Sequence, residues 1–455
     1  MMYDLIVIGA GPAGYLASER AAHAGLNVLC IEKANVGGVC LNEGCIPTKA
    51  LLYSAKLHDG VAHGEKYGVK TENLTIDHKV VLARKNKVVK LLTCGIKSSL
   101  KTLGVTVVTG DARIIDKTDE EVRVSVGEDT FAAKNLLIAT GSSPAIPPIP
   151  GLSDGLNAGF VLTNKEILAL SEVPESLVVI GGGVIGLEMA SYFNSVGSKV
   201  TIIEMLDHIA GENDKELTTI LQKNYEKKGI KFILGARVSD IGASSVSYTV
   251  NDESHTVDCD KVLLSIGRRA NTANLGLEDI GIETNRGAII TDEHMRTNVV
   301  NVYAAGDVNG KSMLAHTAYR EAEVAVNTML GISDEMSYVA VPGVIYTNPE
   351  LASVGITEAN AEAQKLNYKV VKLPMRFSGR YLAENEGGDG IFKLIVDAEN
   401  NRVIGAHALC NYSSEFIVAI GTAIEAKLTL EQIKKIIFPH PTVCEIFREA
   451  IFQCE

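Results

Sequence analysis

Two cysteines, Cys40 and Cys45, lie five residues apart in the segment GGVCLNEGCIPTKALL at residues 37–52. A plant-type iron–sulfur site would need a further cysteine where Thr48 stands, and a structural zinc site would need a second ligand pair that is not evident. A structural disulfide does not suit a chain without secretory features, because the cytosol is reducing. Together with the two nucleotide motifs described below, the pair is more typical of redox-active thiols than of inert ones.

A disulfide between these two cysteines has a geometric requirement. In an ideal helix, residues five apart are separated by about 140° of rotation and their Cα atoms lie roughly 9 Å apart. A disulfide needs Cα atoms closer than about 7 Å. The segment must therefore be distorted or non-helical if the pair is to bond, and Gly44 and Pro47 are residue types that permit this.

Two further segments have the pattern of dinucleotide-binding folds. An apolar run at residues 3–9 ends in GAGPAG at residues 9–14, and a helical pattern and a second apolar run lead to Glu32. Gly9 permits the tight turn, Gly11 lets backbone approach a pyrophosphate, and Gly14 lets helix and strand pack closely. The acid at the end of the second run can accept hydrogen bonds from a ribose.

The same pattern recurs in the middle of the chain. Residues 177–180 lead into GGGVIG at 181–186, with Gly181, Gly183 and Gly186 at the motif positions, and Lys199–Ile203 precedes Glu204. The acid follows the first glycine by 23 residues in both units. The alternative, two glycine turns that bind nothing, fits this repeated context less well. Two such folds suit a flavin and a nicotinamide nucleotide, and Glu204 favours NAD over NADP because it would repel a 2′-phosphate.

Length and composition limit the remaining possibilities. A chain of 455 residues is too long to fold around a single hydrophobic core, and its length suggests about three domains. The net charge of −12 disfavours nucleic acid and anionic membranes as main partners. No apolar run is long enough to span a membrane, and the N-terminus has the pattern of a first strand rather than a signal peptide, so we expect a cytoplasmic protein. Residues 77–103 predict a long helix, and the proline-rich segment 141–151 predicts a stiff interdomain connection.

Over essentially its whole length the chain resembles the pyridine nucleotide–disulfide oxidoreductases and, among them, the dihydrolipoamide dehydrogenases. The segments that carry the resemblance are the cysteine segment, the two glycine motifs, AAGDV at 304–308, VIYTNPELASVG at 344–355 and HPTVCE at 440–445. The resemblance implies an α/β fold with two Rossmann-like dinucleotide-binding domains, a central domain and a C-terminal α+β dimerisation domain. The implied boundaries are 1–143 for the FAD domain with the redox disulfide, 144–269 for the NAD domain, 270–338 for the central domain and 339–455 for the interface domain.

The family resemblance also implies roles for individual residues. Cys40 would exchange with the dithiol substrate, Cys45 would face the flavin, and Lys49 would pair with Glu188 near the flavin–nicotinamide junction. The implied FAD contacts, besides Gly9, Gly11, Gly14, Glu32 and Lys49, are Gly110, Ala139, Thr140, Gly141, Ser142, Asp307, Met313, Leu314, Ala315 and His316. The implied NAD contacts are Gly181, Gly183, Gly186, Glu204, Val238 and Gly267, and no metal is implied.

His440 resembles the family's acid–base, and Glu445 resembles the carboxylate that orients it. An imidazole whose other nitrogen binds a carboxylate can take the proton of a thiol. In the family this histidine comes from the partner subunit, which implies a homodimer. The implied reaction is FAD-dependent oxidation of protein-bound dihydrolipoamide by NAD⁺, and the implied partner is a lipoyl-bearing subunit of a 2-oxo acid dehydrogenase complex or of the glycine cleavage system.

Some residues depart from the commonest family pattern. Phe438 stands where a second histidine is frequent, Cys444 stands where serine is common, and Val39 and Glu43 flank the redox pair. Because of these four residues, the sequence does not fix the redox potential of the cysteine pair. Two other readings also remain: a relative that reduces glutathione disulfide or mercuric ion, for which Cys454 is a single C-terminal thiol, and a flavoprotein scaffold that serves mainly in docking.

Overall fold

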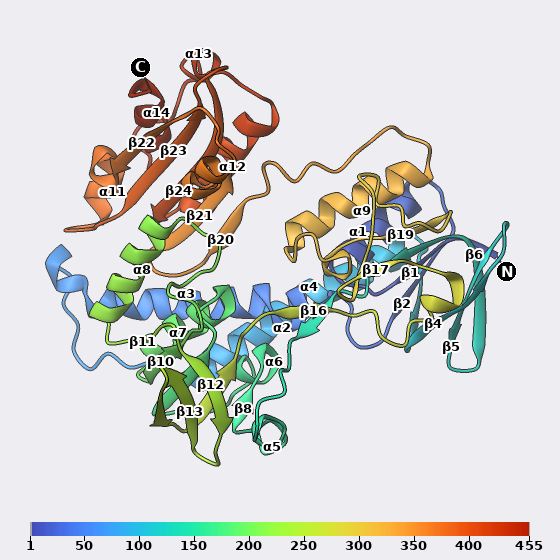
Figure 1. The fold of residues 1–455 in the computed structure, drawn as a ribbon, viewed down its shortest axis with the longest axis horizontal. Coiled ribbons are helices and arrows are strands. Elements are labelled where there is room, and N and C mark those ends of the chain that lie inside the picture. Colours follow the sequence, from blue (N-terminus) through green and yellow to red (C-terminus); the bar gives the residue numbers. More distant parts are fainter. Residues whose placement is uncertain (1, 455) are drawn as a thin grey trace. The chain divides into compact units, whose positions relative to one another are not determined.

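The structure, a computed structural model, describes residues 2–454. It divides into two compact units (Figure 1). The first unit comprises Met1–Ala50, Val80–Ile146 and Gly267–Ser337, and the second comprises Leu51–Lys79, Pro147–Ile266 and Tyr338–Glu455. The predicted four-domain division stays a prediction.

The first unit is built around a sheet in which β1 (Met2–Ile8) lies between β2 (Val28–Glu32) and β6 (Asp129–Ile138), parallel to both. Every residue of β2 is buried, as expected of a central parallel strand covered on both faces. The sheet order is β3-β2-β1-β6-β5-β4, and β19 pairs with β6. The other strands of this unit are β3 (Thr106–Thr109), β4 (Ala112–Lys117), β5 (Val122–Val126), β7 (Ser142–Pro144), β16 (Arg268–Ala270), β17 (Thr284–Asn285), β18 (Ala288–Ile289) and β19 (Val302–Ala304).

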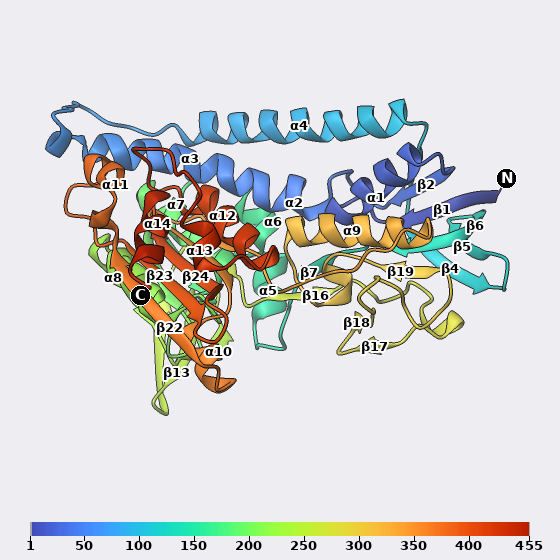
Figure 2. The same cartoon turned by 90° about the horizontal axis from the view of Figure 1, so that it is seen from above.

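Helices α1 (Pro12–His23) and α9 (Ala315–Met329) lie side by side in the first unit (Figure 2). The short helix α2 (Gly38–Glu43) and the start of α3 (Cys45–Ala62) carry the two cysteines. Helix α4 (His78–Thr102) confirms the predicted long helix. Both α3 and α4 have their other ends in the second unit. The 3₁₀ turns of the first unit are η2 (Glu278–Ile280) and η3 (Asp307–Asn309).

The second unit contains a parallel sheet of order β11-β10-β9-β15-β8 and an antiparallel sheet of order β20-β21-β24-β23-β22. In the parallel sheet, β9 (Ser176–Ile180) and β10 (Lys199–Ile203) flank α7 (Val184–Ser195), which gives the second strand–turn–helix–strand unit. The predicted fold class, with two Rossmann-like units and a C-terminal α+β part, is therefore confirmed.

The remaining elements of the second unit are as follows. The strands are β8 (Val161–Leu162), β11 (Lys231–Ile233), β12 (Arg237–Ile241), β13 (Ser245–Val250), β14 (Glu253–Asp258), β15 (Lys261–Leu264), β20 (Gly343–Ile345), β21 (Glu350–Gly355), β22 (Tyr368–Pro374), β23 (Ile391–Asp397) and β24 (Arg402–Cys410). The helices and 3₁₀ turns are α5 (Leu152–Asn157), α6 (Asn164–Ile167), α8 (Lys215–Lys227), α10 (Glu358–Ala363), α11 (Gly379–Glu384), α12 (Ser413–Glu425), α13 (Leu430–Ile433), α14 (Glu445–Phe452), η1 (Gly64–Tyr67) and η4 (Met375–Phe377).

A buried ion cluster links α8 to strand β23 within the second unit. The side chain of Lys393 is 3% exposed, and its Nζ lies 2.7 Å from Asp214 Oδ2 and 3.0 Å from Glu216 Oε2 and from Glu358 Oε2. Asp214 also caps α8, because its side chain accepts the backbone N–H of Glu216. Burial alone would lower the pKa of Lys393, but its hydrogen bonds to the three carboxylates raise it.

We expect Lys393→Met to lower the free energy of unfolding by about 3–5 kcal/mol, because it leaves buried carboxylates without their cation. Urea unfolding followed by circular dichroism measures this loss. The raised pKa means that the stabilisation is fully present below the ordinary lysine value of 10.5, so the loss should be equal at pH 7 and pH 9. The exposed Lys372, which contacts Glu216 and Glu358, is the control: Lys372→Met should cost less than about 1 kcal/mol. Equal losses in the two variants would contradict the assignment.

Candidate functional site

The two cysteines lie on either side of a break between two helices. Helix α2 ends at Glu43, Gly44 has φ −148° and ψ −110°, and α3 begins at Cys45. A Cβ on Gly44 would lie 3.0 Å from the carbonyl oxygen of Val39, so glycine suits this break. Both cysteines are half-buried in their reduced form, and their side chains are hydrogen-bonded to each other. The distortion predicted from the five-residue spacing is confirmed.

The two thiols are electrostatically different. The hydrogen bond with Cys45, followed by burial and the negative charge of Cys45, raises the pKa of Cys40. Lys49, one turn into α3, opposes this effect with its positive charge. Cys40 therefore loses its proton less readily than an isolated thiol would.

The first glycine motif forms a tight turn between β1 and α1. Gly9 has φ +99°, and a Cβ there would lie 2.4 Å from the carbonyl oxygen of Ala139, while a Cβ on Gly14 would lie 1.7 Å from that of Gly9. A Cβ on Gly11 would meet only Gly38 Cα, at 3.9 Å. Within the described chain, no side chain caps α1 at Gly11. The amides at this helix start are thus open to a phosphate, which fits the pyrophosphate of FAD.

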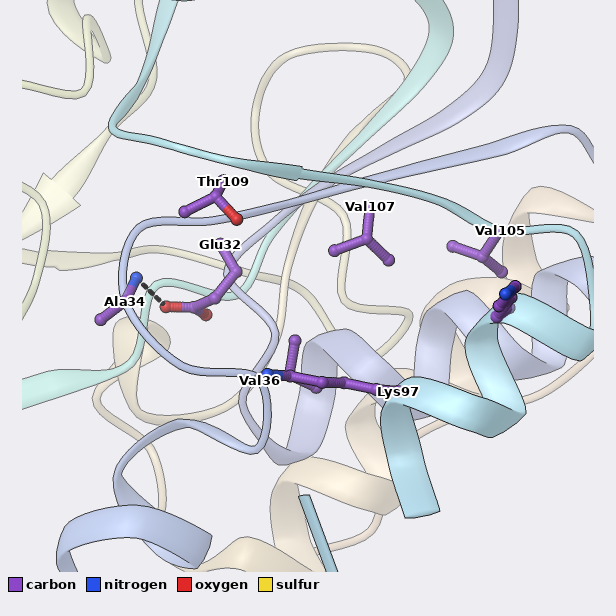
Figure 3. Close-up of a pocket in the computed structure, with 8 residues that line it drawn as sticks. Glu32, Ala34, Val36, Lys97, Val105, Val107 and Thr109 are labelled. Atoms are coloured by element: carbon purple, nitrogen blue, oxygen red, sulfur yellow. Dashed lines mark hydrogen bonds between the residues drawn. The ribbon is translucent and has the colours of Figure 1, made fainter. Parts of the chain in front are cut away.

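Glu32 closes β2 and borders a pocket of about 320 Å³ (Figure 3). Its Oε2 accepts the N–H of Ala10 and its Oε1 accepts the N–H of Ala34, both at 2.8 Å. These contacts hold the carboxylate at the start of the pocket, in reach of a ribose. The pocket is otherwise lined by Val36, Lys97, Lys101, Val105, Val107 and Thr109. Apolar walls with a carboxylate at the edge fit the adenosine end of FAD. The neighbouring Gly110 donates its N–H to Glu32 O at 3.0 Å.

Asp307, which begins the 3₁₀ turn η3 after β19, belongs to a chain of hydrogen bonds. Ser142 Oγ donates to Asp307 Oδ2 at 2.5 Å, and Arg268 Nε donates to Ser142 Oγ at 2.7 Å. Burial lowers the pKa of Arg268, whereas the charges of Asp307, Glu43 and Cys45 raise it. The sequence did not single out Arg268. Its position directly after Gly267, itself an expected NAD contact, is the only signal that could have drawn attention to it.

The other FAD contacts expected from the sequence also lie in the first unit. Thr140 Oγ1 donates to Asn271 O at 2.7 Å, and Gly141 has φ +70°. Residues 313–316 form the start of α9, where Met313 and His316 are exposed and Leu314 is the N-cap residue. The flavin contacts of all these residues stay predictions.

The second glycine motif repeats the geometry of the first. Gly181 has φ +104°, and a Cβ on Gly186 would lie 2.1 Å from the carbonyl oxygen of Gly181, whereas a Cβ on Gly183 would meet nothing within 4 Å. Glu204 accepts the N–H of Gly182 at 2.6 Å and of Leu206 at 2.8 Å. The open backbone and the acid fit a nicotinamide dinucleotide. Of the other expected contacts, Val238 is buried on β12 in the same unit, and Gly267 lies in the first unit.

His440 and Glu445 are paired in the second unit. His440 Nδ1 lies 2.8 Å from Glu445 Oε1, and the N–H of Thr442 donates to Glu445 Oε2 at 2.7 Å. Burial alone would raise the pKa of Glu445, but the hydrogen bonds from Thr442 and His440 lower it. The imidazole is 78% exposed, so Nε2 faces outward from this chain while the carboxylate orients the ring.

Three residues noted in the sequence for their departure from the family pattern or for their C-terminal thiol, Phe438, Cys444 and Cys454, are at least partly buried. Phe438 packs edge-to-face on Phe447, with ring centroids 6.0 Å apart, beside the core of the C-terminal sheet. Cys444 is half-buried, and burial raises its pKa. Cys454 is buried, and its thiol donates to Ala450 O at 3.4 Å.

The expected pairing of Lys49 with Glu188 stays a prediction. Glu188, on α7, is 3% exposed and accepts the N–H of Tyr346 at 2.9 Å, and Lys49 belongs to the first unit. Two tyrosines that the sequence did not single out, Tyr15 and Tyr319, share a hydrogen bond near Cys40. No local pattern pairs residues from such distant segments.

Between residues 2 and 454 no helix combines the length and apolar character that crossing a bilayer requires. The same residues include no group of three or more His, Cys, Asp or Glu side chains arranged to hold a metal ion.

Residues 3–322 match the family of pyridine nucleotide-disulphide oxidoreductases, and residues 341–451 match the dimerisation domain of that family. The chain is 41% identical to the dihydrolipoyl dehydrogenase of Geobacillus stearothermophilus over 98% of this chain and 95% of the relative. It is 38% identical to that of Mycoplasma genitalium over 99% of both chains.

Solved structures agree with these sequence matches. LpdA from Mycobacterium tuberculosis superposes with a TM-score of 0.91 at 27% identity, over 99% of this chain and all of the other. The HOCl-induced flavoprotein disulfide reductase RclA from Escherichia coli superposes with a TM-score of 0.87 at 30% identity over the full length of both.

We expect Cys45→Ala to lower the pKa of Cys40, because it removes the hydrogen bond that contributes most to raising it. The pH dependence of iodoacetamide alkylation of Cys40, read by mass spectrometry on reduced protein, measures the shift. Cys94→Ala, at an exposed thiol, is the control and should change nothing. An alkylation midpoint that stays constant or rises in the Cys45 variant would contradict this account.

We expect Gly183→Ala to weaken NAD binding at least tenfold, because its methyl group meets no protein atom and so occupies space left for a ligand. Calorimetric titration with NADH measures the loss. Thermal stability and flavin content should match the parent chain, since no protein contact is disturbed. Normal NADH affinity would show that backbone at Gly183 does not approach the nucleotide.

Proposed function

We propose that this chain, which belongs to the pyridine nucleotide-disulphide oxidoreductase family, oxidises protein-bound dihydrolipoamide to lipoamide with NAD⁺. The observation that carries the proposal is the helix break at Gly44, where two hydrogen-bonded thiols meet in the unit that has a flavin-type glycine turn. Relatives named dihydrolipoyl dehydrogenase, at 38–41% identity over nearly the whole chain, give the substrate class.

The chemistry begins with thiol–disulfide exchange at Cys40. In the oxidised enzyme, one substrate thiolate attacks the Cys40 sulfur of the Cys40–Cys45 disulfide, and Cys45 leaves as a thiolate. The second substrate thiolate then attacks the substrate sulfur of the mixed disulfide, which releases lipoamide and leaves Cys40 as a thiolate that takes up a proton. Two electrons and one proton thus remain on the cysteine pair. A proton on Cys40 in this end state is in keeping with the raised pKa of that thiol.

The proton released from each substrate thiol needs a base. The partner subunit's His440 would accept the first proton at Nε2 and pass it to the Cys40 thiolate, and would then hold the second, because Nδ1 is engaged by Glu445 at 2.8 Å. The carboxylate holds the ring orientation and stabilises the imidazolium. A homodimer built through the matched dimerisation domain would bring this base to the Cys40 of the other chain.

FAD, when bound, supplies the two-electron relay between the cysteine pair and NAD⁺. Gly11 and the bare start of α1 would hold its pyrophosphate, Glu32 its adenosine ribose, and Asp307 its chain. Gly183 and Glu204 would hold NAD in the second site, where the carboxylate opposes a 2′-phosphate.

We further propose that the physiological partner is a lipoyl-bearing subunit and that the enzyme works in the cytoplasm.

A paired assay on the purified flavoprotein tests the reaction. One arm offers dihydrolipoamide with NAD⁺ or NADP⁺, and the other offers glutathione disulfide with NADH or NADPH. NADH formation confined to the first arm and to NAD⁺ is the expected result. Turnover confined to the second arm would mean that the enzyme is a disulfide reductase, the activity that the name of RclA carries.

We expect His440→Gln to lower kcat with dihydrolipoamide at least a hundredfold, the usual contribution of a general base. NADH oxidation by ferricyanide should be unchanged, because that reaction bypasses the dithiol. Glu445→Gln should lose less than His440→Gln, since the imidazole remains. Steady-state assays of both reactions measure the difference. Near-normal turnover of dihydrolipoamide by His440→Gln would show that this residue is not the base.

A further inference from the structure

Two tyrosines join the helices that frame the first unit's ligand site. The hydroxyls of Tyr15, on α1, and Tyr319, on α9, lie 2.6 Å apart, and their ring centroids lie 6.0 Å apart. One turn later, Arg20 and Glu323 form an ion pair between the same helices at 3.4 Å. The helices, seen side by side in Figure 2, therefore run parallel. Tyr15 and Tyr319 both lie in the first turns of their helices, so the pair is near both N-terminal ends.

Backbone contacts bring the tyrosine pair close to the redox thiols. The N–H of Gly37 donates to Ala10 O at 2.8 Å, and a Cβ on Gly38 would lie 2.6 Å from Gly11 Cα. The start of α2 thus rests directly on the turn that begins α1. Cys40 follows this contact by two residues and Tyr15 follows it by four, so both residues lie within about one helical turn of the same junction. When Cys40 is ionised, its charge raises the pKa of both phenols, which places both near this thiol.

The pair contains a hydrogen-bond donor without an acceptor. Two phenols carry two O–H protons, and the single bond between them uses one. Within residues 2–454 neither hydroxyl has another hydrogen-bond partner. Tyr15 is 8% exposed, while Tyr319 is more accessible. We therefore assign the O–H that has no acceptor to Tyr319.

The spare group stays a neutral donor. Burial, then the hydrogen bond with Tyr319, raises the pKa of Tyr15. Burial, followed among the raising effects by the charges of Cys40 and Cys45, raises the pKa of Tyr319. A neutral phenol beside a thiol exchange site can donate a hydrogen bond to a carbonyl oxygen, whereas a cation has no acceptor for it.

We propose that the Tyr15–Tyr319 pair binds the amide carbonyl of the incoming dithiol and so positions its sulfurs at Cys40. The inference rests on the proposed function, because dihydrolipoamide carries such a carbonyl at the end of a flexible hydrocarbon chain beyond its two thiols. The phenols are positioning residues that favour dithiols with a remote hydrogen-bond acceptor over dithiols without one.

The test compares two dithiols on the holoenzyme. 1,3-Propanedithiol has the reacting head of dihydrolipoamide and no carbonyl. Tyr319→Phe and the double variant with Tyr15→Phe should lower kcat/KM for dihydrolipoamide about three- to tenfold, the range of one neutral hydrogen bond. The same variants should leave kcat/KM for 1,3-propanedithiol within twofold.

The controls separate positioning from general damage. Tyr3→Phe changes a phenol on β1 that packs against Phe131, and it should affect neither substrate. Flavin content and NADH oxidation by ferricyanide should stay normal in every variant. The single Tyr319→Phe variant serves if the double variant folds poorly, because it removes only the more accessible hydroxyl.

Either of two results would overturn the proposal: equal losses with the two dithiols, which would mean that the phenols act on Cys40 itself or on the fold, or no loss with either. Failure of the proposed function looks different, because the parent chain would then fail to oxidise dihydrolipoamide at all.

Discussion

The helix break at Gly44 is the constraint on which the redox chemistry depends. A continuous helix would hold thiols five residues apart on different faces and beyond bonding distance. Ending α2 at Glu43 and restarting at Cys45 turns the two sulfurs toward each other and leaves the second at the start of a new helix. Because Cys45 lies at a helix start, its negative charge is favoured there. Lys49, one turn further on, opposes the rise in the pKa of Cys40 with its positive charge.

The same junction connects the thiols to the cofactor site. The backbone of Gly38 at the start of α2 closely contacts that of Gly11 at the start of α1. The backbone of Gly9 closely contacts that of Ala139, directly after β6. Three backbone segments therefore meet without intervening side chains. A side chain at any of these contacts would separate the thiols from the phosphate-binding turn. The glycines thus serve both the nucleotide and the position of the redox pair.

Protonation at the site is set by pairs of residues rather than by single ones. The hydrogen bond with Cys45 raises the pKa of Cys40, and the hydrogen bonds from Thr442 and His440 lower the pKa of Glu445 despite its burial. Arg268 carries a positive charge within reach of Asp307, Glu43 and Cys45. The negative charge that Glu43 adds beside the redox pair is thus met by a guanidinium from a distant strand.

The sequence by itself determined the features that depend on neighbours along the chain. The glycine turns, the acids that close β2 and β10, the helix over residues 78–102 and the distortion between the cysteines all follow from local spacing, because steric limits and helix geometry act over a few residues. Family motifs added His440 and Glu445. Only the tertiary structure paired Tyr15 with Tyr319, Arg268 with Ser142, and Lys393 with Asp214. These partners lie more than a hundred residues apart, and packing of whole elements, which local patterns do not encode, decides which side chains meet.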